Sequence, residues 1–243
     1  MQLLKLDATP STNTYLKERL GDADLRNGTV VWARKQTMGR GQMGNPWISE
    51  GNKNLTFSVL RRFKGFLAKD AFLLTQGTSL AVHHVLMDLK VPQVRIKWPN
   101  DIMSGNAKMC GILIENTLVG PQLVNAIIGV GLNVNQTAFP KGINATSIRA
   151  RLGREMDVET LLYAILEQLD HFLEMALTLG WEGLYPQYGR ALYKMGKESS
   201  FGVPGRGTFR GSIQGVARDG RLQVRTSAGQ LRSFGLKELE FLD

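Results

Sequence analysis

The chain has 243 residues, 43% of them hydrophobic, and its 30 Lys and Arg against 21 Asp and Glu give a net charge of +9. This hydrophobic content can form a substantial core, which excludes a globally disordered chain. No apolar run is long enough to span a bilayer, and "MQLLKLDATPSTN" at the start lacks the features of a signal peptide. The single cysteine, Cys110, excludes an internal disulfide and agrees with a cytoplasmic location. Its apolar surroundings predict a core residue rather than a nucleophile.

The positive charge indicates an acidic partner, which could be nucleic acid, an acidic protein or a phosphorylated small molecule. The three histidines, His83, His84 and His171, do not form a metal-binding pattern. We therefore expect no metal site built by the protein alone.

Helices and strands alternate in the first part of the chain. Ser11 is a candidate cap for a helix that runs to about residue 20, and an amphipathic helix is predicted over residues 69–89. The predicted strands are "GTVVWARKQ" (28–36), "NLTFSVLRR" (54–62), "VRIKW" (94–98), "GILIEN" (111–116) and "LVNAIIGVGLNV" (123–134).

The composition changes near the C-terminus. Asp157 is expected to cap a long helix that ends before Gly180, and a shorter helical pattern covers residues 181–195. From Ser199 the chain has short alternating runs, "GTFRGSIQGV", "RLQVRTS", "LRSFGL" and "LEFL", separated by turn pairs. This pattern predicts two domains, residues 1–196 and a small β-barrel over residues 197–243.

The stretch "MGRGQMGNPW" at 38–47 places a basic residue between glycines and ends in an indole. Bare backbone and a positive charge suit a phosphate or another anion. An isolated glycine-rich stretch is also typical of an ordinary flexible loop, so the rest of the chain has to decide.

The order and spacing of four stretches distinguish an anion-binding loop from an ordinary flexible loop. These stretches are "STN" (11–13), "QTMGRGQMGNPW" (36–47), "KWPND" (97–101) with "KMCGILIEN" (108–116), and "GVGLNVN" (129–135). Together they resemble the catalytic domain of biotin protein ligases, over about residues 9–150 and again in the C-terminal barrel. The resemblance implies an α+β fold, in which a mixed β-sheet with packed helices, similar to class II aminoacyl-tRNA synthetase cores, precedes a Src-homology-like barrel.

The resemblance also implies the activity. Such an enzyme joins biotin to ATP to form biotinyl-5′-AMP, releases pyrophosphate, and passes biotin to one lysine of a biotin carboxyl carrier protein. ATP, biotin and Mg²⁺ are therefore the expected ligands. The excess of positive charge would serve ATP and the docking of a carrier domain.

The biotin site follows by matching motifs. Arg40 and Lys108 correspond to the family's arginine and lysine that bracket the biotin carboxylate and the reacting phosphate. A carboxylate that attacks a phosphate needs such cations. The remaining expected biotin contacts, which include the polar partners of the ureido ring, are Ser11, Thr12, Asn13, Gln36, Gly39, Gly41 and Gly111.

The nucleotide site is expected to include Arg40, Gln42, Trp47, Lys97, Asn100 and Asn133. Trp47 looks like the family's tryptophan that packs near adenine. Lys97 and Asp101 complete the expected catalytic set, with Asp101 orienting either the acceptor amine or a magnesium-bound water.

Plainer interpretations exist for several of these residues. Without the resemblance, Lys108 would be an ordinary solvated loop lysine, and Ser11 a helix cap only. Gly111 fits simple strand packing as well as a close approach to a ligand.

The sequence also departs from the family pattern. Well-known members carry "GRGRRG"-type loops, whereas Gln42 and Met43 replace the two basic residues here. We expect this loop to form the adenylate but to hold it less tightly.

Two other function classes fit the sequence less well. Some relatives carry an N-terminal winged helix-turn-helix and bind DNA, but the ligase motifs begin at residue 11, so we expect the monofunctional type. Lipoate ligases and octanoyl transferases share fold and acyl chemistry but lack the combination of "GRGQ" and "KWPND". The sequence leaves open whether the chain forms a homodimer, which carrier proteins it serves and in which order its substrates bind.

Overall fold

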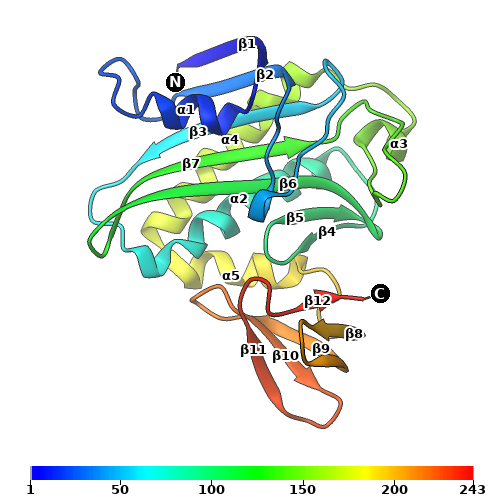
Figure 1. The fold of residues 1–243 in the computed structure, drawn as a ribbon. Coiled ribbons are helices and arrows are strands. Elements are labelled where there is room, and N and C mark those ends of the chain that lie inside the picture. Colours follow the sequence, from blue (N-terminus) through cyan, green and yellow to red (C-terminus); the bar gives the residue numbers. More distant parts are fainter. Residues whose placement is uncertain (1, 243) are drawn as a thin grey trace.

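The computed structural model describes residues 2–242, and of Met43 only the backbone. Figure 1 shows a large sheet with helices above a smaller C-terminal sheet. The elements are β1 (Leu3–Thr9), α1 (Thr12–Glu18), β2 (Val30–Gln36), β3 (Leu55–Arg62), α2 (Phe72–Asp88), β4 (Val94–Lys97), β5 (Asp101–Ser104), β6 (Ala107–Val119), β7 (Gln122–Leu132), α3 (Ile148–Leu152), α4 (Val158–Thr178), α5 (Gly180–Ala191), β8 (Glu198–Val203), β9 (Gly207–Val216), β10 (Leu222–Thr226), β11 (Leu231–Phe234) and β12 (Glu240–Phe241), with 3₁₀ turns at Gln42–Gly44 and Ala68–Asp70.

The large sheet has seven strands in the order β1-β2-β3-β7-β6-β5-β4. The β1–β2 pair is parallel and the other neighbouring pairs are antiparallel, so the sheet is mixed as expected. The long hairpin of β6 and β7 forms its middle and places Gly111 opposite Gly131.

Alternation along β2 shows how the two faces of this sheet are covered. Val30 and Trp32 belong to the main hydrophobic core, whereas Val31 packs with Leu16 of α1 in a smaller cluster. Because successive side chains in a strand point to opposite faces, α1 covers one face and the main core lies on the other. The main core includes residues of α2, α4 and α5, which lie behind the sheet in Figure 1.

The prediction of an amphipathic helix over residues 69–89 is right about the helix and wrong about its exposure. The buried residues of α2 lie all around it and include Thr78 and Ser79. The helix lies between the sheet and the helices α4 and α5, so it has little surface left for solvent. A helix that is buried all round has no solvent-facing polar side to produce an amphipathic pattern.

The five strands predicted before residue 135 are confirmed, although β6 extends further at both ends than its apolar run. Strands β1 and β5 were missed. The first is an edge strand with mostly exposed or half-buried residues, and the second has four residues next to a turn. The predicted cap of α4 is confirmed, because Asp157 accepts a hydrogen bond of 2.7 Å from the Thr160 N–H.

The C-terminal residues form a second, antiparallel sheet of five strands in the order β11-β10-β9-β8-β12. The predicted alternating runs correspond to β9, β10, β11 and β12. Strands β11 and β12 lie at opposite edges, so the sheet is open and the predicted barrel is not confirmed.

The two sheets share one hydrophobic core. Phe201, Ile213 and Val224 of the small sheet belong to the same buried cluster as the centre of the large sheet. The Trp98 indole donates a hydrogen bond of 2.8 Å to the Gly220 carbonyl across this contact. No helix within residues 2–242 is long and apolar enough to cross a membrane.

Candidate active site

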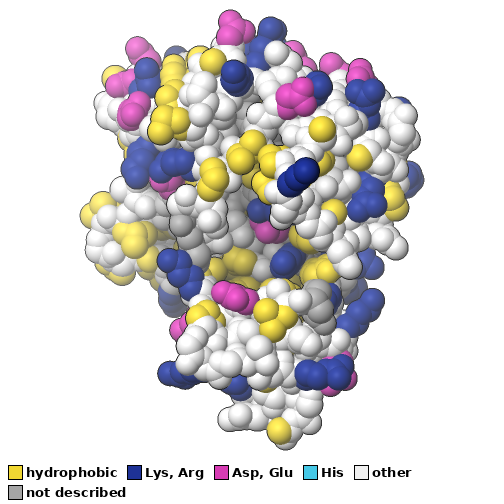
Figure 2. All heavy atoms as spheres, turned by 45° about the vertical axis from the view of Figure 1, so that its right-hand side comes forward, with side chains coloured by type: hydrophobic (Ala, Val, Ile, Leu, Met, Phe, Trp, Pro, Cys, Tyr) yellow, Lys and Arg dark blue, Asp and Glu magenta, His cyan; other side chains and the backbone are white. Residues whose placement is uncertain are grey.

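A cavity of about 790 Å³ opens on the face of the large sheet that carries α1. Figure 2 shows this side of the molecule hollowed between the large sheet and the C-terminal part. Thirteen of the residues predicted for the site line the cavity: Ser11, Thr12, Asn13, Gln36, Arg40, Gly41, Gln42, Trp47, Lys97, Asn100, Asp101, Lys108 and Gly111. Four separate stretches of the sequence thus meet at one place.

The floor of the cavity is flat because glycines of β6 and β7 face it. A Cβ on Gly131 would lie 2.5 Å from the Trp47 ring, and a Cβ on Gly111 would lie 3.1 Å from it. The indole therefore rests on two paired strands that carry no side chains at that point. Its N–H is buried and has no hydrogen-bond partner among the described residues.

The segment between β2 and β3 folds over this floor. The Gly41 N–H donates to the Asn45 carbonyl at 2.7 Å, and the Trp47 N–H donates to the Gly39 carbonyl at 2.9 Å. A Cβ on Gly39 would collide with the Trp47 carbonyl, so this close turn requires a glycine. The turn fixes Arg40 and Trp47 relative to each other.

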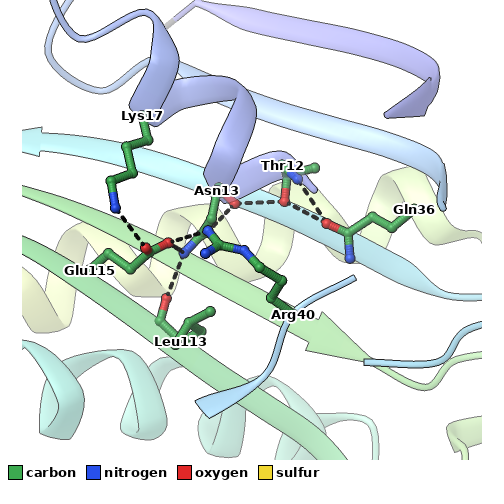
Figure 3. A network of polar contacts seen from close by, with 8 residues as sticks. Thr12, Asn13, Lys17, Gln36, Arg40, Leu113 and Glu115 are labelled. Carbon is green, nitrogen blue, oxygen red and sulfur yellow. Dashed lines mark hydrogen bonds and ion pairs between the residues drawn. The ribbon is translucent and has the colours of Figure 1, made fainter. Parts of the chain in front are cut away.

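One wall is a hydrogen-bond network that starts at α1 (Figure 3). The backbone N–H and the hydroxyl of Thr12 both lie near the Gln36 Oε1, at 2.8 and 3.1 Å. The Ser58 hydroxyl lies 2.6 Å from both the Thr12 hydroxyl and the Asn13 Oδ1. Since an amide oxygen can only accept, Ser58 donates to Asn13. This network turns the Gln36 oxygen toward Thr12 and leaves the Gln36 NH₂ group without a partner in the described chain.

Ser11 occupies the N-cap position of α1, but its side chain makes no capping hydrogen bond. Gln36 receives the Thr12 N–H in its place. The expectation that the Ser11 side chain caps the helix is therefore wrong. Its buried hydroxyl lines the cavity instead.

Two lysines and one carboxylate form a charged cluster at the other end. The Lys108 Nζ makes an ion pair of 2.6 Å with the Asp101 Oδ1. It also lies 5.6 Å from the centre of the Trp47 ring. Burial lowers the pKa of Lys97, and the nearby Lys108 adds to this, while Asp101 opposes it.

The second predicted cation is paired as well. The Arg40 guanidinium lies 2.9 Å from the Glu115 Oε2, which also accepts a hydrogen bond of 2.9 Å from Asn13 (Figure 3). The site thus combines bare backbone, free amide and hydroxyl donors, and two cations that each have a carboxylate partner. Such a site can bind a polar head group at one end and handle anionic groups at the other.

Comparison with known proteins decides the family. The model of the biotin/lipoate A/B protein ligase family matches residues 6–133, which include every motif discussed above except the end of "GVGLNVN". This chain belongs to that family.

Named relatives agree with this. The chain is 32% identical to the bifunctional ligase/repressor BirA of Escherichia coli over 76% of its own length, and 28% identical to the biotin–[acetyl-CoA-carboxylase] ligase of Paracoccus denitrificans over 93%. The match covers 56% of the length of Escherichia coli BirA and 57% of the length of BirA from Salmonella typhimurium. It covers 95% of the length of the Paracoccus denitrificans ligase. The chain therefore spans little more than half the length of these two BirA proteins.

A solved structure extends the likeness to the whole fold. The biotin protein ligase of Aquifex aeolicus in complex with biotin and ATP superimposes with a TM-score of 0.81 at 26% identity, over 98% of this chain and 97% of the other. The mixed sheet with packed helices is thus the fold of this family.

Two predicted family contacts lie away from the cavity. The Asn133 side chain is buried and donates to the Thr146 carbonyl at 3.1 Å, and Gly39 forms the turn beneath the loop without lining the cavity. Asn100 does line it, yet its NH₂ group donates to the Ile112 carbonyl at 2.6 Å. These positions support the walls of the site in this structure.

Sequence reasoning missed Ser58, Glu115 and a group of C-terminal residues that contribute to this site. Ser58 was hidden in an apolar strand, where a buried polar residue on the cavity face was the available signal. Glu115 was quoted within "GILIEN" but assigned no role. Pro204, Leu236, Lys237, Leu239, Glu240 and Phe241 reach the cavity from the C-terminal sheet, and no motif connects them to it.

Proposed function

We propose that this chain is an ATP-dependent biotin protein ligase. It forms biotinyl-5′-AMP from biotin and ATP and then transfers biotin to a lysine of a biotin carboxyl carrier protein. The observation that carries the proposal is that Arg40 and Lys108 line one cavity, together with glycines of β6 and β7 and a wall of polar side chains. The names of the relatives and the bound biotin and ATP of the Aquifex enzyme support it.

The first step needs the two cations. A biotin carboxylate oxygen attacks the α-phosphorus of ATP, the new oxygen–phosphorus bond forms, and the bond to pyrophosphate breaks. Arg40 and Lys108 offset the negative charge that the two anions bring together. Because each cation already has a carboxylate partner, the incoming anions share Arg40 with Glu115 and Lys108 with Asp101.

The second step needs an amine. The neutral amine of the carrier lysine attacks the biotinyl carbonyl and the new amide bond forms. The amine loses a proton to solvent, and AMP leaves with the electron pair of the acyl–oxygen bond. Asp101 is the proposed group that orients this amine, since it lines the cavity between Lys97 and Lys108. The substitution Asp101→Asn removes the negative charge while keeping a side chain that can form hydrogen bonds.

The ureido ring of biotin is a neutral group with donors and acceptors. The free NH₂ of Gln36 and the hydroxyl of Ser11 can serve its carbonyl oxygen. Thr12 and Asn13 act by fixing this wall, because their polar groups are already occupied by neighbours. Gly41 gives the ligand close access to backbone. Gly111 instead makes room for the Trp47 ring and the Lys108 side chain, which lie directly over it.

The nucleotide is assigned to the region of Trp47, Gln42 and Lys97. The unpartnered Trp47 N–H is a buried donor that a ligand atom can satisfy. Asn100 and Asn133 are assigned as supports of this region, and Gly39 as the turn that holds its loop.

Mg²⁺ is expected to enter with ATP. No group of three or more His, Cys, Asp or Glu within residues 2–242 could hold a metal by itself. This fits Mg²⁺, which is commonly held by substrate phosphates and one or two carboxylates. Asp101 and Glu240 are the two cavity carboxylates that could serve it, and the ion would offset phosphate charge.

The remaining assignments complete the proposal. Residues 1–196 are assigned as the catalytic domain, and residues 197–243 as a small C-terminal domain, an open five-stranded sheet with residues that close one side of the cavity. The carrier protein is the macromolecular partner and the cytoplasm the compartment.

The family also contains lipoate ligases, which makes lipoate the alternative substrate. Acid-dependent ATP–pyrophosphate exchange separates the two, with biotin, lipoate and octanoate assayed in parallel. Exchange with biotin alone is the predicted result. Exchange with lipoate or octanoate would reassign the substrate, and no exchange with any acid would contradict ligase activity.

A further inference from the structure

Glu115 lies where three segments of the site meet. Its Oε2 is within 2.9 Å of both the Asn13 Nδ2 and the Arg40 guanidinium, and its Oε1 lies 3.4 Å from the Lys17 Nζ (Figure 3). One carboxylate on β6 therefore contacts the helix α1 and the glycine loop at once.

The position of Glu115 follows from strand periodicity. Gly111 and Leu113 line the cavity, and Glu115 follows on the same face of β6 at the same spacing of two residues. Glu115 itself does not line the cavity. It acts on the site only through the residues that it contacts.

Its first effect is on Asn13. The two N–H groups of this amide donate to the Leu113 carbonyl at 3.2 Å and to Glu115, and its oxygen accepts from Ser58. These three contacts determine which way the amide faces. The orientation is passed on to Ser58 and Thr12, and from them to Gln36.

Its second effect is on Arg40. This arginine projects from the glycine loop, whose turn holds its backbone, and its long side chain is held by a contact of its own. Glu115 is the carboxylate that ties the guanidinium to the sheet, and it engages one nitrogen. The other N–H groups of Arg40 have no hydrogen-bond partner in the described chain and remain available to an anion.

We infer that Glu115 is a positioning residue. It holds the Arg40 guanidinium and the hydrogen-bonded wall that ends at Gln36 in the arrangement that binds the acid substrate. This inference rests on the proposed function. Glu115 touches no reacting atom, so it should affect the KM for biotin and the retention of the adenylate, and leave kcat nearly unchanged.

The test is a double-mutant cycle with Glu115→Gln and Arg40→Gln, followed by biotin-dependent ATP–pyrophosphate exchange. In Glu115→Gln the new amide oxygen can still accept from Asn13, so the change mainly removes the two ion pairs. We expect the KM for biotin to rise about two- to fivefold, the range open to a partly exposed ion pair. In the Arg40→Gln background the same change should add almost nothing, because Glu115 acts through Arg40.

Controls separate this role from a general loss of stability. Glu167→Gln removes an exposed carboxylate of α4 and should leave both constants unchanged. Glu115→Asp keeps the charge but shortens the reach, so it should repeat the rise in KM at an unchanged melting temperature. If Glu115→Gln fails to fold, Glu115→Asp decides the question alone.

Three results would overturn the inference: an unchanged or lower KM, a change in kcat alone, or effects of the two substitutions that simply add. Each assumes that the wild-type chain carries out the exchange with biotin. Its failure to do so would contradict the proposed function instead.

Discussion

Burial lowers the pKa of Lys97, so the folded protein bears a desolvation cost for this charge. Because the folded pKa is below the usual 10.5, the unfolded state binds the proton more tightly. The stability of the folded protein therefore rises as the pH increases from the folded pKa of Lys97 to its unfolded pKa. Below the folded pKa the desolvation cost is fully present. Lys97→Met should raise the urea midpoint at pH 7, and this gain should shrink as the pH approaches 10.5.

The same substitution should lower the exchange rate by about ten- to a hundredfold, since it removes a cation from the phosphate site. Lys141→Met, at an exposed position, is the matched control and should change neither property. A midpoint for Lys97→Met that is equal to or below that of the wild type would contradict the argument from burial.

At the level of elements, the paired glycines of β6 and β7 make room for Trp47. A methyl group on Gly131 would meet the indole at 2.5 Å and must displace it. We expect Gly131→Ala to raise the KM for ATP at least about tenfold, with a smaller effect on the KM for biotin. Gly21→Ala is the control, because a Cβ there meets nothing within 4 Å. Unchanged constants in Gly131→Ala would show that the indole has no part in nucleotide binding.

The elements also show how far sequence reasoning reaches. The continuous apolar run of β7 and the alternation in β9 identify both strands, because burial on two faces or on one leaves a distinct pattern. The edge strand β1 has no such pattern, since its residues are largely exposed. Within the first 135 positions, the cavity residues other than Phe57 lie in the quoted motifs, whereas the role of Ser58 depends on which strands lie side by side.

At the scale of the whole molecule, the two sheets share a core and should unfold together. Phe201 and Val224 of the small sheet belong to the same buried cluster as Phe57 of the large one. We expect urea unfolding monitored by fluorescence of the four tryptophans, which all lie within residues 1–196, to coincide with unfolding monitored by far-UV circular dichroism, which reports on both sheets. Two separate transitions would show that the C-terminal sheet folds independently.

This arrangement also places C-terminal residues next to the N-terminal motifs. Phe241 lies under the Lys97 ammonium, 4.9 Å from it, although 144 positions separate the two residues in the sequence (241 − 97). No local pattern encodes such a contact, because it arises from the packing of one sheet against the other.

The central claim is that Lys108 and its neighbours activate biotin with ATP. The most direct measurement is biotin-dependent ATP–pyrophosphate exchange by the wild type, by Lys108→Ala and by Lys64→Ala, a control at an exposed lysine. We predict exchange in the wild type and in Lys64→Ala, and a loss of about a hundredfold or more in Lys108→Ala. Equal exchange by all three proteins would contradict the account of the site, and no exchange by any of them would contradict the proposed reaction.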